Sequence, residues 1–354
     1  MRKVLYIGWI GYRNLGDDLL WHAFRELHAR YLSSDQITVV PSFPAVNIRQ
    51  LEPYDTVVLG GGSLIAPSYI AVLYKAMKMG KKILIWGSGI DRIPETQLYH
   101  LQNNEKVSTI LRFQGEERDK LREVFQGAVF AGVRGPYTKR VIEILTGEQE
   151  ISVIGDPGLL LEVEKNSPNR QQTIGINWGT TNNQLYGGNE KMLEDQIVSV
   201  AQQLIEDGYD MFIYAVWDQD FAACQRLVTK IDREKSVVFE RKLYSEQELM
   251  TKLSECQLTI NFKLHPNVLS FAAGTPAIAL GYRFKVFDLY ASLALAELVL
   301  TTNSKDLDQQ IIELVSVTNN NREQIMSVYR AKQDLYRPKI ESPFVDSTFY
   351  MNRK

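Results

Sequence analysis

Hydrophobic and polar positions follow one repeated order along the chain. Short apolar runs end in glycine-rich or charged turns, and longer amphipathic stretches come after them. In the first half, the runs that predict strands are 4–7, 56–59, 83–86, 128–133 and 151–154. A helical pattern over 19–31 follows the first of them. Strand, turn and helix in repetition predict a parallel sheet covered by helices on both faces.

The polar stretch EVEKNSPNRQQ at 162–172 interrupts this order and predicts a linker. A helix is then expected at 194–207, and a polar-rich one at 322–336. The expected strands of this half are 173–177, 212–216, 237–239, 258–262 and 277–280. Two doubly wound, Rossmann-like domains facing each other across a cleft would give the α/β architecture typical of GT-B transferases.

The domain boundaries follow from the same pattern. The first domain is expected at 1–165, as the probable acceptor side, and the second at 166–335, as the donor side. The pattern leaves open whether a tail over 336–354 returns to the first domain. A length of 354 residues agrees with two domains of ordinary size.

Composition excludes several classes of protein. Hydrophobic residues make up 45% and charged residues 23%, which is typical of globular domains. The net charge is −2, without a long block of like charge, so no nucleic-acid partner is expected. Two cysteines are too few for a disulfide framework or a zinc site and suit a reducing cytosol. With no run of 18 apolar residues, we expect a cytoplasmic protein that does not span a membrane.

The first glycine-rich loop, GWIGYRNLGDD, is a candidate anion site. Gly11, Asn14 and Gly16 let backbone amides approach a ligand at a helix N-terminus. The loop lacks both the G-x-G-x-x-G spacing and the ending of a P-loop, so simple turns are an equal alternative. Asp17 and Asp18 fall in the first helical turn, where at least one is expected to have only a capping role.

Further candidates follow later strands. The segment GGGSLIAPS places Gly61, Gly62 and Ser63 after an apolar run, which predicts a close approach by a ligand or by the other domain. Arg134 follows another buried run, where its guanidinium needs an anion; a ligand is slightly favoured over an internal carboxylate. Gly179 opens the matching loop of the second domain.

His265 is a lone histidine after the strand at 258–262. A structural role is the commoner one for such a residue, but Lys263 lies two positions before it, and Arg283 and Lys285 follow the next strand. Among cations, a histidine holds its proton more firmly once an anion enters. This favours a general acid that becomes protonated when an anionic substrate binds.

Six segments in order resemble the polysaccharide pyruvyl transferase family: GYRNLGDDLL, VVLGGGSLI, GVRGPYTKR, IGDPGLLL, IGIN and KLHPNVLSFAAGTPAIALGYRFKV. The resemblance covers most of the chain. It implies a GT-B-like enzyme that places a pyruvate ketal from phosphoenolpyruvate on a sugar of a cell-surface or cell-wall polysaccharide, or of its lipid-linked precursor. The essential histidine of the family maps to His265 and its donor-binding arginine to Arg134. The chain departs from the family pattern with Lys263 in place of an arginine.

The implied chemistry agrees with the residues. The resemblance implies that phosphoenolpyruvate would be held by Arg134, by Lys263, and by Arg283 or Lys285. His265 would protonate its methylene carbon. Asp17 or Asp18 would serve as the base for the attacking hydroxyl.

The partners follow from the same implication. No metal or cofactor is needed, and phosphoenolpyruvate is a co-substrate. The saccharide acceptor is expected at the loops of the first domain. A lipid-linked acceptor would bring the enzyme into peripheral contact with the inner face of the cytoplasmic membrane. The oligomeric state stays open.

Three other functions remain as alternatives. A GT-B glycosyltransferase would use a nucleotide sugar, and Glu240 and Glu248 have a spacing similar to that of a sugar-binding glutamate pair. They precede the strand at 258–262, so we interpret the pair as coincidental. A dinucleotide-dependent oxidoreductase is disfavoured because the fingerprint is missing. A carbohydrate-binding scaffold without catalysis is the third.

Overall fold

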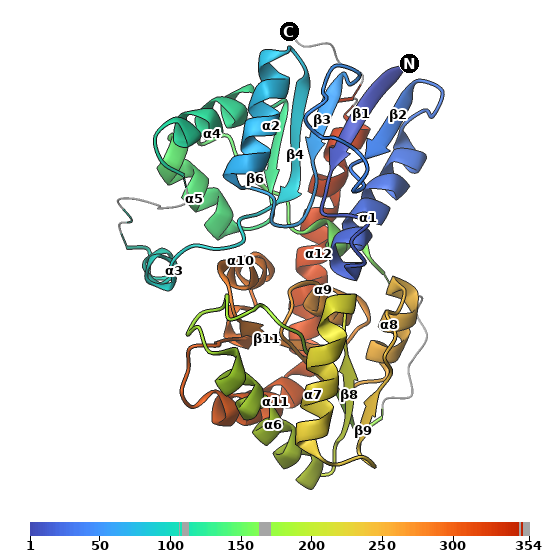
Figure 1. The fold of residues 1–354 in the computed structure, drawn as a ribbon, viewed down its shortest axis with the longest axis vertical. Helices are drawn as coiled ribbons and strands as arrows, with labels where there is room; N and C mark the ends of the chain where they lie inside the picture. The colour runs from blue at the N-terminus through green and yellow to red at the C-terminus, as the bar shows by residue number, and fades with distance from the viewer. Residues whose placement is uncertain (106, 108–112, 163–170, 347, 350–354) are drawn as a thin grey trace. The chain divides into compact units, whose positions relative to one another are not determined.

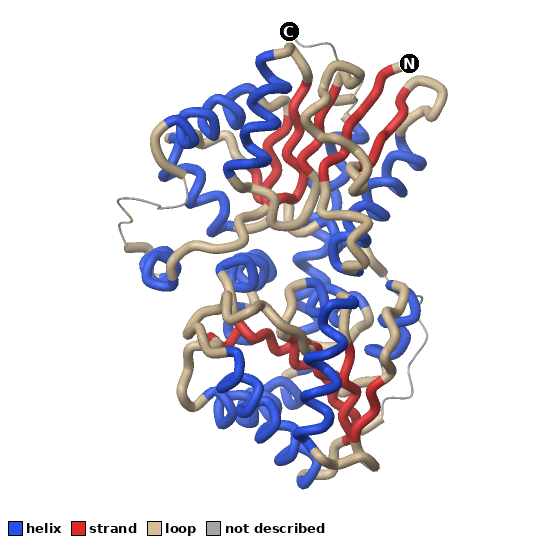
Figure 2. Tube along the Cα trace, in the orientation of Figure 1, coloured by secondary structure: helices blue, strands red, loops and turns tan. Residues whose placement is uncertain are grey.

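The computed structural model describes residues 1–105, 107, 113–162, 171–346, 348 and 349. It divides into two compact units. The first unit comprises Met1–Tyr12, Asp17–Leu160 and Gln333–Lys354, and the second comprises Arg13–Gly16 and Leu161–Lys332. Each unit is a sheet with helices on both faces (Figures 1 and 2).

The sheet of the first unit has, within the described residues, six parallel strands in the order β2-β1-β3-β4-β5-β6. The strands are β1 (Arg2–Ile7), β2 (Ile37–Pro41), β3 (Thr56–Leu59), β4 (Lys82–Ser88), β5 (Phe130–Val133) and β6 (Ser152–Val153). The helices are α1 (Leu15–Tyr31), α2 (Pro67–Lys78), α3 (Glu95–Gln102), α4 (Glu116–Gly127), α5 (Pro136–Thr146), η1 (Pro157–Leu160) and the end of α12 (Arg322–Val345). Every residue of β3 and β4 is buried, as a parallel strand covered on both faces requires.

The second unit repeats this plan. Its described strands form one parallel sheet in the order β12-β11-β10-β7-β8-β9. They are β7 (Thr173–Asn177), β8 (Asp210–Tyr214), β9 (Val237–Phe239), β10 (Leu258–Asn261), β11 (Ala277–Gly281) and β12 (Val299–Thr301). The helices are α6 (Glu190–Glu206), η2 (Asp218–Asp220), α7 (Phe221–Ile231), α8 (Glu246–Ser254), α9 (His265–Ala272), α10 (Phe284–Leu293), η3 (Ala296–Leu298) and α11 (Leu307–Asn320).

All ten predicted strands are present, and the predicted Rossmann-like α/β class is confirmed. The pattern missed β2 and β12, which lie at sheet edges and are short and only partly buried, so their apolar signal is weak. The helix expected at 19–31 begins at Leu15 and the one expected at 194–207 begins at Glu190, because polar first turns hide a helix start. Of the predicted linker, 163–170 lie outside the described residues. No helix in the described residues is both long and apolar enough to cross a bilayer.

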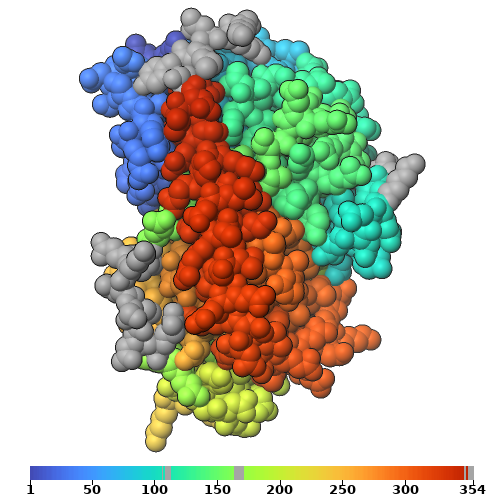
Figure 3. All heavy atoms as spheres, turned by 180° about the vertical axis from the view of Figure 1, so that it is seen from behind, coloured from blue at the N-terminus to red at the C-terminus, as the bar shows by residue number. Residues whose placement is uncertain are grey.

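The C-terminal half of α12 packs in the first unit. Tyr336, Ile340 and Phe344 are buried, and the indole Nε1 of Trp86 donates a hydrogen bond of 2.8 Å to the carbonyl oxygen of Ile340. The Phe344 ring meets Phe24 edge to face, with centroids 5.1 Å apart. Seen from behind, the last turns of α12, in red, lie between the blue and green segments of the same unit (Figure 3). The chain therefore contributes its C-terminal helix to the core of its N-terminal sheet.

We expect Ile340→Ala to destabilise the first unit by about 2 to 5 kcal/mol, because it removes a fully buried side chain and leaves a cavity. Leu335→Ala on the same helix is the matched control, since Leu335 is 47% exposed and should change stability by no more than about 0.5 kcal/mol. Thermal unfolding followed by tryptophan fluorescence measures both. Equal effects of the two substitutions would contradict this packing.

Candidate functional site

Each sheet has one point where its strand order reverses. In the first sheet the chain moves outward in opposite directions from β1 and β3, and in the second sheet from β7 and β10. The loops after two such strands turn to opposite faces and leave a crevice at the carboxyl edge, where ligands of open α/β sheets bind. The predicted site residues divide between these two edges.

The glycine run after β3 is packed by side chains of the protein itself. A Cβ on Gly60 would collide with the Tyr6 ring, and a Cβ on Gly61 would lie 3.0 Å from Leu20. Gly62 has a φ of +97°, and a Cβ there would lie 3.2 Å from Asp17 Oδ1. These glycines predicted that a ligand or the other domain comes close to this backbone. In the structure, side chains of the same unit lie there.

Arg134 lies inside the first unit with no exposed surface. Its Nη1 donates to the Gly62 carbonyl at 3.4 Å, and its Nη2 donates to Ser63 Oγ at 3.3 Å and to the Ile90 carbonyl at 3.4 Å. Its Nε has no hydrogen-bond partner among the described residues. Burial raises the pKa of the Asp156 carboxyl, and the charge of Arg134 partly offsets this rise. Arg134 thus stabilises the glycine loop through hydrogen bonds in this structure. Its role in donor binding stays a prediction.

The two aspartates of α1 have different surroundings. Asp18 accepts a hydrogen bond of 2.9 Å from the Gly11 amide, which is the loop-capping role expected for one of them. Asp17 lies beside Gly62 and near Tyr6, whose pKa is raised by burial first and by Asp17 second. Of the two carboxylates, Asp17 is therefore the one at the switch point of the first sheet.

His265 is the first residue of α9, directly after β10 at the switch point of the second sheet. The segment Arg13–Gly16 belongs to this unit, where the Leu15 amide donates to the Val216 carbonyl at 2.9 Å. Gly16 lies so close to the His265 ring that an added Cβ would overlap Nδ1. The Asn14 side chain accepts from the Gly16 amide at 3.1 Å. Gly16, from the predicted anion loop, and the predicted acid are therefore neighbours within the second unit.

Lys263 is held by a buried carboxylate. Its ammonium donates to the Thr180 carbonyl at 2.6 Å and lies 3.3 Å from Asp220 Oδ1, with the Lys263 side chain 13% and the Asp220 side chain 0% exposed. The Thr180 amide donates to the same Asp220 oxygen at 3.0 Å, and Gly179 packs against this carboxylate so tightly that no Cβ would fit. Asn177 Oδ1 accepts from the Lys263 amide at 2.9 Å. Asp220 thereby joins the loops after β7, β8 and β10.

Arg283 and Lys285 lie at the start of α10, after β11, the neighbour of β10. Arg283 Nε donates to the Gln184 carbonyl at 2.7 Å, and its guanidinium lies 5.2 Å from the centroid of the Tyr282 ring. The Lys285 ammonium lies 5.4 Å from the same ring. Both side chains are partly exposed at the carboxyl edge that carries His265.

Sequence reasoning missed the buried polar residues behind these candidates: Tyr6, Asp156, Asn177 and Asp220. Asp156 in GDPG follows a predicted strand and Asn177 is the last residue of another, which was a usable signal. Asp220 stands six residues beyond β8 among other polar residues, so only the fold reveals its contact with Lys263.

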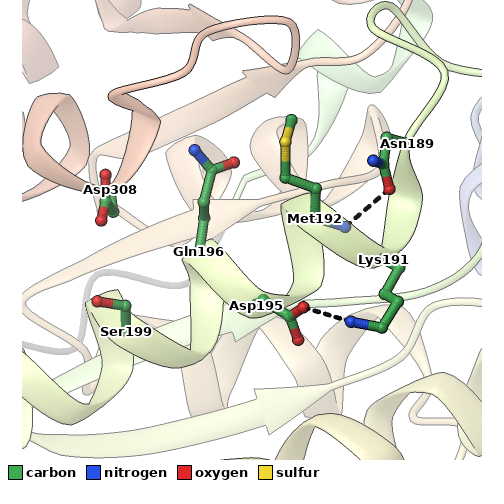
Figure 4. Close-up of a pocket in the computed structure, with 7 residues that line it drawn as sticks. All are labelled: Asn189, Lys191, Met192, Asp195, Gln196, Ser199 and Asp308. Carbon is green, nitrogen blue, oxygen red and sulfur yellow. Dashed lines mark hydrogen bonds and ion pairs between the residues drawn. The ribbon is translucent and has the colours of Figure 1, made fainter.

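Other features lie away from the switch points. A groove of about 320 Å³ over α6 is lined by Asn189, Lys191, Met192, Asp195, Gln196, Ser199 and Asp308, with Lys191 and Asp195 paired on the helix surface (Figure 4). No predicted site residue lines it.

Glu248 forms the capping box of α8 with Ser245. Glu240 lies 3.3 Å from Lys252 at the surface, so the glutamate pair has structural roles.

Neither cysteine has the character of a nucleophile. Cys224 and Cys256 are buried, and burial raises the pKa of Cys256 to about 12. No group of three or more His, Cys, Asp or Glu residues suited to a metal ion occurs in the part of the chain described. The expectation of a reaction without metal stays untested.

Solved structures share the fold. The S. aureus MnaA–UDP co-structure matches with a TM-score of 0.63 and 10% identity, over 99% of this chain and 96% of that chain. The calicheamicin glycosyltransferase CalG4 matches with a TM-score of 0.52 and 13% identity, over 98% of both chains. Anabaena Alr3699/HepE in complex with UDP and glucose matches with a TM-score of 0.53 and 10% identity, over 99% of this chain and 100% of that chain. The fold is thus the predicted GT-B-like one of two Rossmann-like domains.

Sequence similarity defines the family within this fold. The sequence model described as polysaccharide pyruvyl transferase matches residues 14–283, so the chain belongs to that family. The amylovoran biosynthesis protein AmsJ of Erwinia amylovora is 34% identical over 82 residues, which are 23% of this chain and 20% of AmsJ. The chain thus aligns with only about a fifth of that relative. The family match includes Arg134, Lys263 and His265.

We expect Gly16→Ala to lower the rate of the catalysed reaction by about 100-fold, because the new methyl group must displace the His265 ring and misplacement by about 1 Å can have such an effect. The displacement should appear as a shifted ring signal of His265 in NMR spectra. Gly80→Ala is the control for the ring position. Its φ of +77° means that the substitution lowers stability, but no described atom lies within 4 Å of its Cβ position, so the His265 signal should not shift. An unshifted His265 signal in Gly16→Ala would contradict the contact.

The Asp220 carboxyl predicts a pH dependence of stability. Burial raises its pKa, and Lys263 offsets only part of the rise. Because the folded state then holds the proton more tightly than the unfolded chain, this stability is present at low pH and is lost as pH rises through the folded pKa. We expect the Tm of the wild type minus that of Asp220→Asn to decrease as the pH rises from about 4, the ordinary pKa of an aspartate, through the raised pKa of the folded state.

The matched control for this titration is Asp210→Asn, which removes an exposed carboxyl of the same unit. Its Tm difference from the wild type should change less with pH. A pH-independent difference for Asp220→Asn would show that the buried carboxyl does not bind a proton more tightly on folding.

Proposed function

We propose that this protein transfers the enolpyruvyl group of phosphoenolpyruvate to a sugar of a polysaccharide, or of its lipid-linked precursor, as a pyruvate ketal with release of phosphate. Family membership supports the class of reaction. The observation that carries the proposal is the position of His265 at the switch point of the second sheet, packed against Gly16 and on one edge with three cationic side chains. AmsJ, by its name an amylovoran biosynthesis protein, agrees with a saccharide acceptor.

Phosphoenolpyruvate carries a phosphate and a carboxylate, so its site must supply positive charge. Arg283 and Lys285 are partly exposed at the start of α10 and suit these groups. The Lys263 ammonium is shared with Asp220 and Thr180, which reduces its attraction for a ligand. We therefore assign the main anion contacts to Arg283 and Lys285. Lys263 is assigned the role of holding the turn before His265 in place.

His265 acts as the general acid. It delivers a proton to the methylene carbon of the enol, which becomes a methyl group and leaves an electrophilic carbon. One sugar hydroxyl adds to that carbon and loses its proton to a carboxylate. Phosphate departs with the electrons of its C–O bond, and a second hydroxyl closes the ketal and gives its proton to the departing phosphate. Asp18 binds the Gly11 amide, which favours Asp17 as the carboxylate that accepts the hydroxyl proton. These steps use no metal ion and no cofactor.

We expect His265→Gln to bind phosphoenolpyruvate like the wild type but to release phosphate about 100- to 10,000-fold more slowly, as the loss of a general acid predicts. Binding is measured as thermal stabilisation, which reaches about 2.7 kcal/mol at a hundredfold excess over the Kd. Phosphate release is measured by phosphorus NMR with lipid-linked and free glycans as acceptors. Normal release by His265→Gln would exclude His265 as the acid.

The donor assignment has its own controls. Arg283→Gln and Lys285→Gln should reduce the stabilisation by phosphoenolpyruvate, whereas Arg241→Gln, which removes an exposed cation of the same unit, should not. Parallel titrations use UDP, GDP and NAD. Stabilisation by a nucleotide and not by phosphoenolpyruvate would replace the proposal with a nucleotide-sugar transferase or an oxidoreductase. Glycan binding without phosphate release on any donor would indicate a non-catalytic scaffold.

A further inference from the structure

Three large aromatic side chains are exposed beside the strand ends of the first unit. Trp9 and Tyr12 are each 40% exposed, and Phe43 is 43% exposed. Trp9 follows β1 by two residues, and Phe43 follows the neighbouring β2 by two residues. We call these three residues the aromatic platform. It lies at the carboxyl edge of the sheet, where open α/β sheets bind ligands.

Local contacts hold the platform in one arrangement. The rings of Trp9 and Tyr12 are stacked, with centroids 4.3 Å apart and planes 17° from parallel. Gly11 has a φ of +78°, and a Cβ on it would lie 2.8 Å from the Phe43 ring. Gly11 is also the residue whose amide is bound by Asp18. The loop is therefore fixed between Phe43 on one side and α1 on the other.

A second set of hydrogen bonds joins the two strand ends that carry the platform. Ser42 Oγ accepts from the Gly8 amide and donates to the Gly8 carbonyl, both at 3.0 Å. The Ser42 amide donates to the Tyr6 carbonyl at 2.9 Å. Exposed apolar side chains that are clustered and rigid are typical of binding sites, because a site with fixed side chains loses little entropy when a ligand binds.

We propose that the aromatic platform binds the face of a neutral pyranose, as part of the acceptor saccharide. The axial C–H groups of a pyranose form a flat apolar face that stacks on aromatic rings, and its hydroxyl rim needs hydrogen-bond acceptors. Asp17 supplies such an acceptor from the adjoining first turn of α1, and Asp18 adds a second negative charge there while its carboxylate binds the Gly11 amide. Tyr69 adds a hydroxyl, and both Tyr12 and Asp17 contribute to its raised pKa after burial.

The same carboxylates disfavour other occupants. A surface of anionic lipid needs cations around the aromatic rings, and carboxylates beside them repel it. An anionic sugar meets the same repulsion. The inference deepens the acceptor side of the proposed function and rests on it, but it concerns binding and is tested without pyruvyl transfer.

The test uses the full chain and a panel of methyl α- and β-glycosides of glucose, galactose, mannose and their N-acetylamino forms, with saturation-transfer NMR to measure binding. We expect the wild type to bind at least one member. Trp9→Leu keeps an apolar side chain without a flat ring and should bind at least about tenfold more weakly, as loss of an aromatic anchor predicts. Trp9→Phe should recover most of the affinity.

The matched control is Tyr99→Ala, which removes a ring that is 58% exposed on α3 of the same unit. It should bind like the wild type. Unchanged binding by Trp9→Leu, or no saturation transfer to any glycoside, overturns the inference. So does sedimentation with phosphatidylglycerol vesicles that is lost in Trp9→Leu, which would identify a lipid surface as the occupant.

Titration of the same samples with phosphoenolpyruvate separates this inference from the proposed function. If phosphoenolpyruvate stabilises both the wild type and Trp9→Leu but no glycoside binds, the platform fails and the donor assignment stands. If a glycoside binds through Trp9 and phosphoenolpyruvate does not stabilise the protein, the platform stands and the proposed reaction fails.

Discussion

Burial of both faces of each parallel sheet is the constraint on which the rest of the structure depends. Strands such as β3 and β4 have no exposed residue, so they cannot present polar groups along their length. Polar side chains that could meet a ligand therefore come from the loops after the strands, and each sheet has one reversal of strand order, the position at which open α/β sheets bind ligands. Asp17, in one unit, and His265, in the other, occupy these two positions.

Buried charges then fix the loops at these edges. Removing an ion from water costs several kcal/mol unless it is paired and hydrogen-bonded. Asp220 meets this condition through Lys263 and Thr180. Arg134 meets it in part, through carbonyl groups of two loops and through the charge of Asp156 nearby. The main effect of such groups is to order the loops, because each ion has one arrangement in which its partners are in reach. Because the loop after β7 is ordered in this way, the turn before His265 also has a defined position.

Glycines complete the loops by letting other residues come close. Gly16 makes room for the His265 ring and Gly179 for the Asp220 carboxylate, while Gly60 makes room for Tyr6. In each case the neighbour is a side chain of the same unit and not a ligand. The glycines of these loops therefore serve mainly to let neighbouring side chains pack against the backbone. A ligand is expected to contact those side chains.

The sequence by itself determined the class of fold, because apolar runs ending in glycine specify buried parallel strands whatever their order in the sheet. It also placed His265, Arg134, Asp17 and Asp18 in loops at the carboxyl edges of the sheets, since these residues follow such runs, and their roles in the reaction stay predictions. It did not determine that Arg134 is fully enclosed, that Asp220 holds Lys263, or that Trp9 and Tyr12 stack in the open. Only the tertiary structure decided these, because the partners are far apart in the sequence or exposed by a local turn, and hydrophobic periodicity carries no information about which polar groups meet.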